Sequence, residues 1–214
     1  MKKILTSIIF LCICGFSFAE NEIGIGAGLP FKMIHADGND AHGMGYELDV
    51  LYNYRKENEL VYSVEAALGP YLFDSYSLKD SSRVQLNITI LGGIGYDFLK
   101  DKKGQSLVLS GLLGVDILTD TKPFENYKYV DGSYVKIESS IVNFTSGINL
   151  IYSVTLKNKL SFYTGCAFIA GLGWSNDRVT RQEDRFHEEK TLYNEYKGSY
   201  EFGLLPKIGL TYKF

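Results

Sequence analysis

The three histidines are the first residues to consider for chemistry, because each stands near carboxylates in the sequence. His35 and His42 lie around two aspartates, and His187 directly precedes two glutamates. These acidic neighbours are Asp37, Asp40, Glu188 and Glu189. An imidazole beside a carboxylate can serve as a general acid or base, so a hydrolytic enzyme is one hypothesis. No serine is spaced as a nucleophile and no family motif surrounds a histidine, so we expect solvated side chains and no enzymatic activity.

Two further patterns concern a metal or a cofactor. Loop residues that could supply metal ligands are His35, Asp37, Asp40 and His42. Their spacing fixes no coordination geometry, so this hypothesis is weaker than the enzymatic one. The glycines at positions 24, 26 and 28 resemble a nucleotide-binding loop, but they alternate along a strand pattern and no helix follows. We therefore expect neither a metal nor a cofactor.

The N-terminus has the pattern of a secretory signal peptide. Two lysines precede an apolar run over 4–18, and a small-x-small cleavage site ends at Ala19. We expect residues 1–19 to be removed, which leaves 20–214 as one domain. An uncleaved anchor is the alternative, although the run is short for a membrane-spanning helix.

Cysteine usage and charge narrow the class of protein. Lipidation of Cys14 is an alternative fate of the N-terminus. The bulky Ile13 argues against it, because a small residue usually precedes a lipidated cysteine. After cleavage Cys166 is the only cysteine, so an internal disulfide is excluded. The net charge of −3 argues against a nucleic-acid partner. Twenty-two Gly, 16 Tyr and 13 Phe beside four Pro favour sheet over helix.

Eight segments alternate between apolar residues and small or polar ones, as two-faced strands do. They span 22–31, 46–55, 62–69, 84–98, 107–118, 142–154, 160–174 and 202–214. The last is regular: every second residue back from Phe214 is apolar. Segment 107–118 is the least regular, because Val108, Leu112 and Leu118 fall on its polar side.

The volume of a small barrel decides which face of these strands points outward. The interior of an eight-stranded barrel is just wide enough for side chains to fill, so it cannot hold the aromatic and large aliphatic residues. We therefore expect the apolar face outside, against lipid, and the small and charged residues inside. The inward charges are Glu47, Asp49, Arg55, Glu65, Asp97, Asp116 and Lys207. We expect them to form a paired network, and a narrow pore of small conductance remains an alternative.

The aromatic residues sort to the two ends of the segments. One end carries Tyr52, Tyr54, Tyr62, Tyr96, Phe98, Tyr152, Phe162, Tyr212 and Phe214. The other end carries Phe31, Tyr46, Phe144, Trp174 and Phe202. Two such bands are typical of the interfacial girdles of a membrane barrel.

Short and long connections alternate along the chain. Short polar turns are expected at 56–59, 99–105 and 155–159, and long loops at 33–45, 73–83, 119–140 and 175–199. Transmembrane barrels have short periplasmic turns and longer extracellular loops. In this architecture, its signal peptide and its terminal Phe214, the chain resembles the small eight-stranded outer-membrane β-barrels of the OmpA and OmpX type.

The resemblance implies an all-β fold: an eight-stranded antiparallel up-and-down transmembrane β-barrel in the outer membrane of a Gram-negative bacterium or a spirochaete. It implies a monomer in outer-membrane lipid, with periplasmic termini and extracellular long loops. It also implies that Tyr212 and Phe214 serve as an assembly signal for the barrel assembly machinery. An enzyme that acts on lipid A or peptides with loop histidines is the alternative function.

The long loops carry residues suited to binding. Tyr and Arg are favoured contact residues in protein interfaces. The candidate interaction residues are Tyr127, Tyr129, Tyr134, Arg178, Arg181 and Arg185. We expect a structural role or a surface interaction, with a host or matrix protein as the partner class.

Overall fold

The computed structural model describes residues 20–36, 39–55, 60–75, 82–100, 102–120, 124–128, 134–182 and 190–214. The strands are β1 (Glu20–Gly28), β2 (Phe31–Ala36), β3 (Asn39–Gly45), β4 (Glu47–Arg55), β5 (Leu60–Ser75), β6 (Ser82–Asp97), β7 (Gln105–Asp120), β8 (Phe124–Lys128), β9 (Tyr134–Lys157), β10 (Leu160–Gln182) and β11 (Lys190–Lys213). Within this part of the chain, no helix is long and apolar enough to cross a membrane. The expected signal peptide, 1–19, lies outside the described residues.

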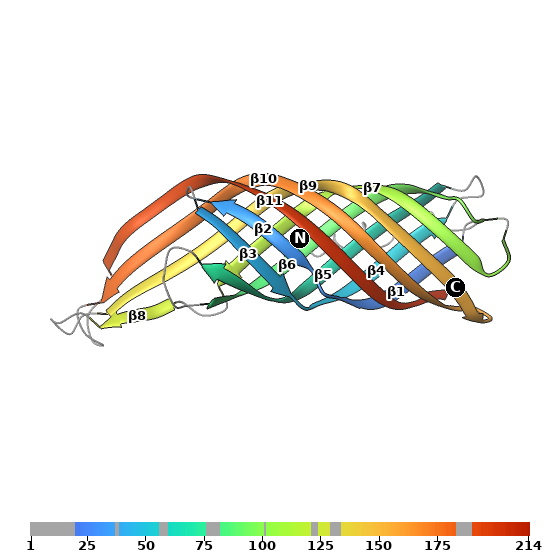
Figure 1. Cartoon of the computed structure of the whole chain (residues 1–214), viewed down its shortest axis with the longest axis horizontal. Coiled ribbons are helices and arrows are strands. Elements are labelled where there is room, and N and C mark those ends of the chain that lie inside the picture. The colour runs from blue at the N-terminus through green and yellow to red at the C-terminus, as the bar shows by residue number, and fades with distance from the viewer. Residues whose placement is uncertain are drawn as a thin grey trace, which may run out of the picture.

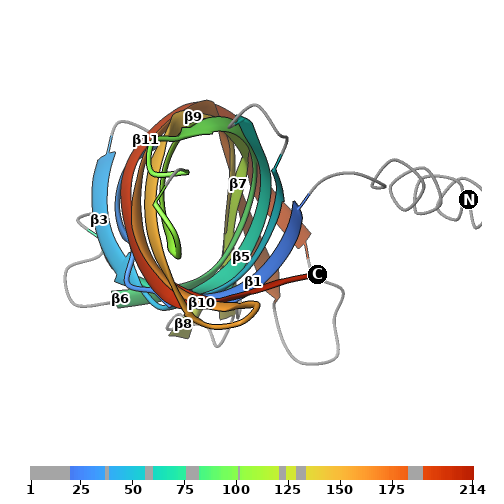
Figure 2. The ribbon, with the colours of Figure 1, turned by 90° about the vertical axis from the view of Figure 1, so that its right-hand side faces the viewer.

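The strands close into a barrel (Figures 1 and 2). The pairing gives eight wall positions around the ring, each filled by one long strand or by two short strands in line, and we call each position a stave. Strands β1 and β2 follow each other along one stave, and β3 and β4 along the next, because the register is continuous across each break. The other six staves are β5, β6, β7, β9, β10 and β11. All pairs are antiparallel, and β11 pairs with both β1 and β2, which closes the ring. The predicted all-β, eight-stranded barrel is confirmed.

Side chains alternate between the lumen and the outer face as the sequence pattern predicts. On β4, Glu47 and Asp49 are buried while Leu48 is 72% exposed. The irregular segment 107–118 keeps the same alternation: Val108 and Leu112 are buried with the polar residues of their face. Apolar side chains therefore also fill part of the lumen, and the outer face is left apolar, as a bilayer-spanning barrel requires.

The two aromatic bands lie on the outer face. At the end of the barrel that carries the short turns, here called the turn end, Tyr96 and Phe98 are exposed and their ring centroids are 5.0 Å apart. At the other end, Phe144 and Trp174 form an edge-on pair at 5.9 Å. Exposed aromatic rings at both ends of an apolar wall match the girdles expected at the two membrane surfaces.

Three of the four expected long loops are largely strand, which corrects the sequence interpretation, and in the fourth, 73–83, β5 ends at Ser75, β6 begins at Ser82 and 76–81 are not described. Region 33–45 is an antiparallel hairpin of β2 and β3, and region 175–199 consists of the ends of β10 and β11 around 183–189, which is not described. Region 119–140 contains β8 and the first residues of β9. The ends of β10 and β11 lack an apolar stripe because polar residues such as Arg178 and Asn194 stand among their exposed side chains, and the ladder of backbone hydrogen bonds does not need an apolar face.

The short turns are confirmed where the structure describes them. Strands β9 and β10 are joined by Asn158 and Lys159 alone, and Asn158 adopts a positive φ of 51°. The turn after β6 is closed by Gly104, whose φ is 75°. Asn and Gly are the residues that tolerate this left-handed conformation. The expected turn 56–59 lies outside the described residues.

Candidate functional site

An ion pair at the centre of the lumen organises its polar interior. The Lys32 ammonium group on β2 lies 2.7 Å from Oδ1 of Asp116 on β7, and both side chains are 0% exposed. Lys32 also donates to Oδ1 of Asn87 at 3.1 Å, and Thr89 donates to the same Asp116 oxygen at 2.5 Å. Removal of two charges from water is costly unless they are paired and hydrogen-bonded, and both conditions are met here.

Glu47 connects the wall of the barrel to this centre. Its Oε1 accepts hydrogen bonds from the Tyr71 hydroxyl at 2.7 Å and from Nδ2 of Asn87 at 2.8 Å. Asn87 thereby links Glu47 to Lys32. A glutamate on β4 and a tyrosine on β5 are thus locked to residues of β6 and β2.

Three further ion pairs lie nearer the turn end of the lumen. Lys207 on β11 pairs with Glu65 on β5. Arg55 donates to Oδ2 of Asp97 at 2.5 Å and contacts Glu22 at 3.2 Å. The predicted network of inward charges is therefore confirmed for these residues.

Apolar side chains fill the space that the polar network leaves. One buried cluster lies at the end of the barrel that carries the β2–β3 hairpin, here called the hairpin end. It comprises Ile34, Tyr71, Phe73, Leu118 and Ile141. The other comprises Leu91, Leu112, Ala167, Ile169 and Leu205. With both clusters and the ion pairs in place, the lumen is packed with side chains, as the size of an eight-stranded barrel predicts.

Sequence reasoning missed four lumen residues: Lys32, Tyr71, Tyr163 and Glu201. Tyr163 donates to Oδ1 of Asp49 at 2.7 Å, and Glu201 accepts from Thr145 at 2.9 Å. All four lie on the inward parity of their strands. Lys32, Tyr71 and Glu201 stand just past the ends of the expected segments, so a longer alternation would have found them.

Three prolines weaken the wall at one level of the barrel. Leu29 N–H donates to Pro206 O at 3.1 Å, Gly45 N–H to Pro30 O at 3.0 Å and Tyr46 N–H to Pro70 O at 3.1 Å. Each donor faces its proline directly in the register of the sheet. Directly opposed residues of such a pair normally exchange two bonds, but proline has no N–H to return.

We name Pro30, Pro70 and Pro206 the proline row. They occupy three consecutive seams, between β2 and β3, between the β3–β4 stave and β5, and between β11 and the β1–β2 stave. Each seam lacks one ladder bond at this level. The breaks between β1 and β2 and between β3 and β4 fall here for that reason.

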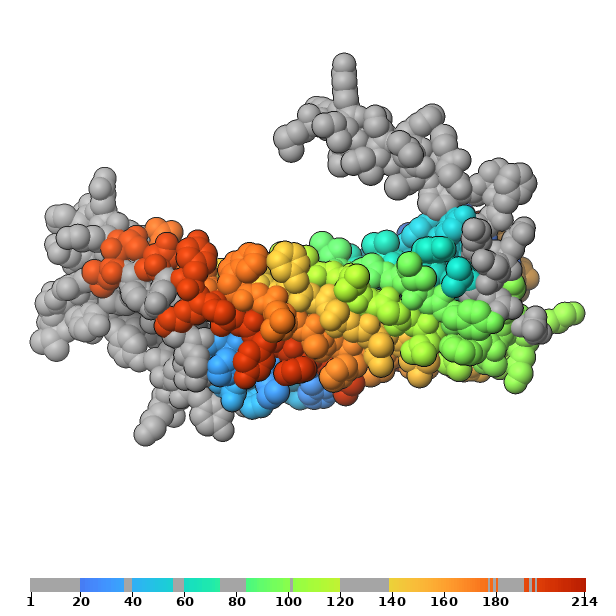
Figure 3. Space-filling model, turned by 90° about the horizontal axis from the view of Figure 1, so that it is seen from above, coloured from blue at the N-terminus to red at the C-terminus, as the bar shows by residue number. Residues whose placement is uncertain are grey.

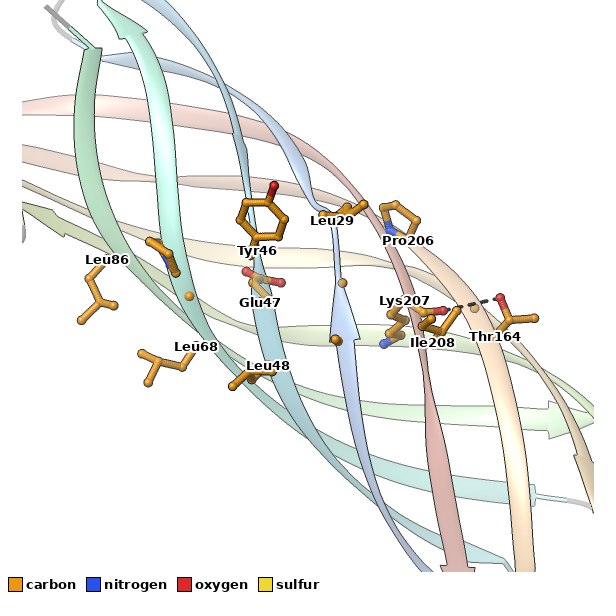
Figure 4. Close-up of a pocket in the computed structure, with 15 residues that line it drawn as sticks. Leu29, Tyr46, Glu47, Leu48, Leu68, Leu86, Thr164, Pro206, Lys207 and Ile208 are labelled. Carbon is orange, nitrogen blue, oxygen red and sulfur yellow. Dashed lines mark hydrogen bonds between the residues drawn. The ribbon is translucent and has the colours of Figure 1, made fainter. Parts of the chain in front are cut away.

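An apolar groove of 750 Å³ is lined by two residues of the proline row, Pro70 and Pro206, whereas Pro30 is buried and does not line it (Figure 4). Its outward-facing lining includes Leu29, Tyr46, Leu48, Pro70 and Pro206. The buried Glu47 and Lys207 also line it, and their hydrogen bonds and ion pair fill the lumen behind the wall. The groove therefore opens on the outer face of the barrel.

The candidate histidines lie at the hairpin end. His35 on β2 is hydrogen-bonded to Oδ1 of Asp40 at 2.7 Å and stacks on Tyr200 with ring centroids 4.5 Å apart. His42 on β3 is exposed. His187 and Asp37 lie outside the described residues. Among the residues described, no group of His, Cys, Asp and Glu is arranged to hold a metal ion.

Four of the six candidate interaction residues lie on strands and not in loops, which corrects their expected setting. Tyr127 is on β8, Tyr134 begins β9, and Arg178 and Arg181 are on β10. The sheet brings β8, β9 and β10 side by side. Tyr129 and Arg185 lie outside the described residues.

The ends of β9, β10 and β11 continue beyond the aromatic band as one sheet, which Figure 1 shows at one end of the molecule, and Figure 3 shows the orange and red atoms of β10 and β11 at that end. The part of β10 past Trp174 runs from 175 to 182, a reach of roughly 26 Å at about 3.3 Å per residue. Tyr196 on the facing part of β11 is 65% exposed, and Leu192 and Tyr200 are exposed too. Arg178 is exposed opposite Asn194.

The candidate assembly residues end the closing strand. Tyr212 faces Ile23 on β1 and Leu160 on β10, and its side chain is exposed in the turn-end aromatic band. Phe214 donates its N–H to Asn21 O at 3.0 Å and is 60% exposed. Both side chains are therefore available on the outer face.

Solved structures of outer-membrane proteins share this fold. The outer membrane protein OprG from Pseudomonas aeruginosa has a TM-score of 0.56 at 13% identity, covering 92% of this chain and 96% of that one. A major outer membrane protein from Thermus thermophilus has a TM-score of 0.57 at 13% identity, covering 92% and 100%. No protein-family model and no curated protein matches the sequence. The chain has the fold of the small outer-membrane β-barrels.

Proposed function

We propose that this protein is an outer-membrane barrel that binds a host or matrix protein through the outer ends of β10 and β11. The observation that carries the proposal is a patch on one face of that sheet, formed by Arg178, Leu192, Tyr196 and Tyr200. We call it the outer-sheet patch. All four side chains are exposed, and the paired strands carry Arg178, Tyr196 and Tyr200 in regular register, with Leu192 at a bulge between Thr191 and Tyr193.

The chemistry of the outer-sheet patch suits a protein partner. Tyrosine and arginine are enriched among residues that dominate interface energies, and a rigid scaffold lowers the entropy lost on binding. Register places Asn176 opposite Tyr196 and Asn194 opposite Arg178, so amide groups lie between the aromatic and cationic side chains. The patch thus combines apolar contact area with hydrogen-bonding groups.

The lumen supports binding over transport. Ion pairs cross it and two apolar clusters fill it. In this proposal the staves anchor the outer sheet in the membrane, the termini are periplasmic, and the protein works as a monomer.

The test uses cells that display the protein and surfaces coated with laminin, fibronectin or collagen. We expect adhesion to at least one surface, and a drop of tenfold or more in adhesion by Arg178→Ala combined with Tyr196→Ala. Leu113→Ala, on the exposed face of β7, is the matched control and should adhere like the parent. Adhesion that survives deletion of 176–198 in a barrel that still folds would refute the assignment.

The enzymatic alternative predicts a chemical product. If the outer histidines are not catalytic, separate replacement of His35, His42 and His187 by alanine leaves the lipid A of the cells unchanged in mass spectra. A mass change that disappears in one of these variants would favour the enzyme over the binding protein.

A further inference from the structure

Pro70 and Pro206 of the proline row line the apolar groove on the outer face, and the buried Pro30 stands at the same level in the seam between them. Proline is depleted within sheets because it removes a ladder hydrogen bond. In a bilayer the loss is larger, because no water is present to satisfy the facing carbonyl. Three of the four prolines of the chain nevertheless stand at one level, on three adjoining seams.

We propose that the apolar groove is a binding site for one acyl chain of an outer-leaflet membrane lipid. Its volume of 750 Å³ falls within the range of about 300–1,000 Å³ that ligand pockets have. Its outward lining is mostly aliphatic and proline side chains with Thr164, and Tyr46 is the aromatic residue at the edge nearest the hairpin end. The groove recognises a chain by shape and apolar contact.

The position of the groove selects this occupant. Phe31 and Tyr46 belong to the aromatic band at the hairpin end, and Leu48 and Leu68 lie on the membrane side of that band. Only lipid reaches an outward-facing groove at this depth, and acyl chains of the outer leaflet are the nearest source. Behind the wall, Glu47 and Lys207 keep their partners, so the chain docks and does not enter the lumen.

The prolines shape the groove by keeping the seams from closing. Each pyrrolidine ring occupies the place of a donated N–H, so the carbonyls of Leu29, Gly45 and Tyr46 receive no ladder bond from the residue opposite. An N–H at those three places would draw the strands into regular pairing. Restoring these donors is therefore the direct way to disturb the site.

Cys166 provides a native reporter. It is a free cysteine directly opposite Pro206, and its neighbours Thr164 and Gly165 line the groove. A bimane label on Cys166 can be quenched by a phosphatidylcholine that carries a doxyl group on one acyl chain. The labelled full-length mature barrel is folded into phosphatidylcholine vesicles, and the mole fraction of doxyl lipid is varied.

We expect quenching at Cys166 to saturate at a low mole fraction of doxyl lipid. The matched control places the label on Leu113→Cys in a Cys166→Ser background, on the exposed face of β7. There quenching should rise gradually with the bulk concentration of doxyl lipid. Identical curves at the two positions would overturn the proposal.

Two variants test whether the prolines and the open groove cause the saturable quenching at Cys166. Combined Pro30→Ala, Pro70→Ala and Pro206→Ala should raise the half-saturating mole fraction at least fivefold while the barrel unfolds at the same temperature or a higher one. Ala27→Phe fills the groove from the outer face without changing the ladder, and it should have the same effect on quenching. Unchanged saturation in both variants would show that the groove does not hold the chain. Loss of adhesion to matrix proteins is not expected in either variant, so this test is separate from the proposed function.

Discussion

Lys32 and Asp116 meet at 2.7 Å across the lumen, although 84 positions separate them in the chain. They come from β2 and β7, which are four staves apart in a ring of eight, so the ion pair spans opposite walls. Together with Asn87 and Thr89 it ties three staves to one another. The barrel is thus held together by its ladder around the circumference and by this polar network through its centre.

Replacement of Lys32 should destabilise the barrel strongly. Lys32→Met leaves the Asp116 carboxylate buried without its cation, a change that typically costs about 3–5 kcal/mol. Urea unfolding of the refolded barrel in detergent measures the loss. Lys213→Met is the control, because the Lys213 side chain is partly exposed, its partner Glu20 is exposed, and its other partner Glu22 keeps the ion pair with Arg55; such exposed pairs contribute about 1 kcal/mol or less. Equal midpoints for the two variants would contradict the role given to the central pair.

The double variant separates charge from packing. Lys32→Met with Asp116→Leu removes both charges and should recover more than half of the stability that Lys32→Met loses, because no unpaired charge remains. A double variant as unstable as the single one would show that hydrogen bonds to Asn87 and Thr89, and not the charge pair, carry the effect.

Two glycines on β7 should respond oppositely to alanine. A Cβ at Gly114 would overlap the backbone oxygen of Ile90, whereas a Cβ at Gly111 meets nothing within 4 Å. We expect Gly114→Ala to lower the free energy of unfolding by about 1–3 kcal/mol or more. Gly111→Ala should be neutral or stabilising by about 0.5–1 kcal/mol, since glycine weakens a strand. Urea titration and the mobility of unheated protein in gel electrophoresis measure the stability of both variants. A neutral Gly114→Ala would contradict the close approach of Gly114 to the backbone oxygen of Ile90.

The terminal aromatic should matter for assembly in cells more than for stability. Phe214 and Phe98 lie in the same aromatic band, and their side chains are 60% and 56% exposed. Only Phe214 belongs to the expected C-terminal assembly signal, and Phe98 is the matched control. Phe214→Ala should reduce the fraction of barrel assembled in the outer membrane severalfold, while Phe98→Ala has little effect. Both variants should refold in detergent with similar stability. A shared assembly defect would mean that the band, and not the C-terminal signal, is being recognised.

Much of this architecture follows from residue parity alone. The period-two pattern places Leu48 outside and Glu47 inside, and it assigns Lys32 and Glu201 to the lumen once the segments are extended. Parity cannot say which inward residues meet, because that depends on how the staves are staggered around the ring. The Lys32–Asp116 contact and the alignment of the three prolines are consequences of that stagger.

The outer strand ends were beyond sequence reasoning for a different reason. Arg178, Asn194 and Tyr196 are exposed on these strand ends, where polar and apolar side chains mix, so the pattern resembles a loop. Backbone pairing continues there without a hydrophobic signature. The interaction role of the candidate residues stays a prediction, and the setting of Arg178 and Arg181 on β10 could be found only in the structure.

Labelling of intact cells tests the central claim, a membrane barrel with its long strand ends outside. Single cysteines at Tyr196, Arg178, Lys102 and Asn158 are compared in a Cys166→Ser background with a membrane-impermeant maleimide. We expect Tyr196→Cys and Arg178→Cys to be labelled on whole cells, and Lys102→Cys and Asn158→Cys to be labelled only after the outer membrane is opened. Labelling of the two turn positions on intact cells, with the two strand positions protected, would contradict this orientation.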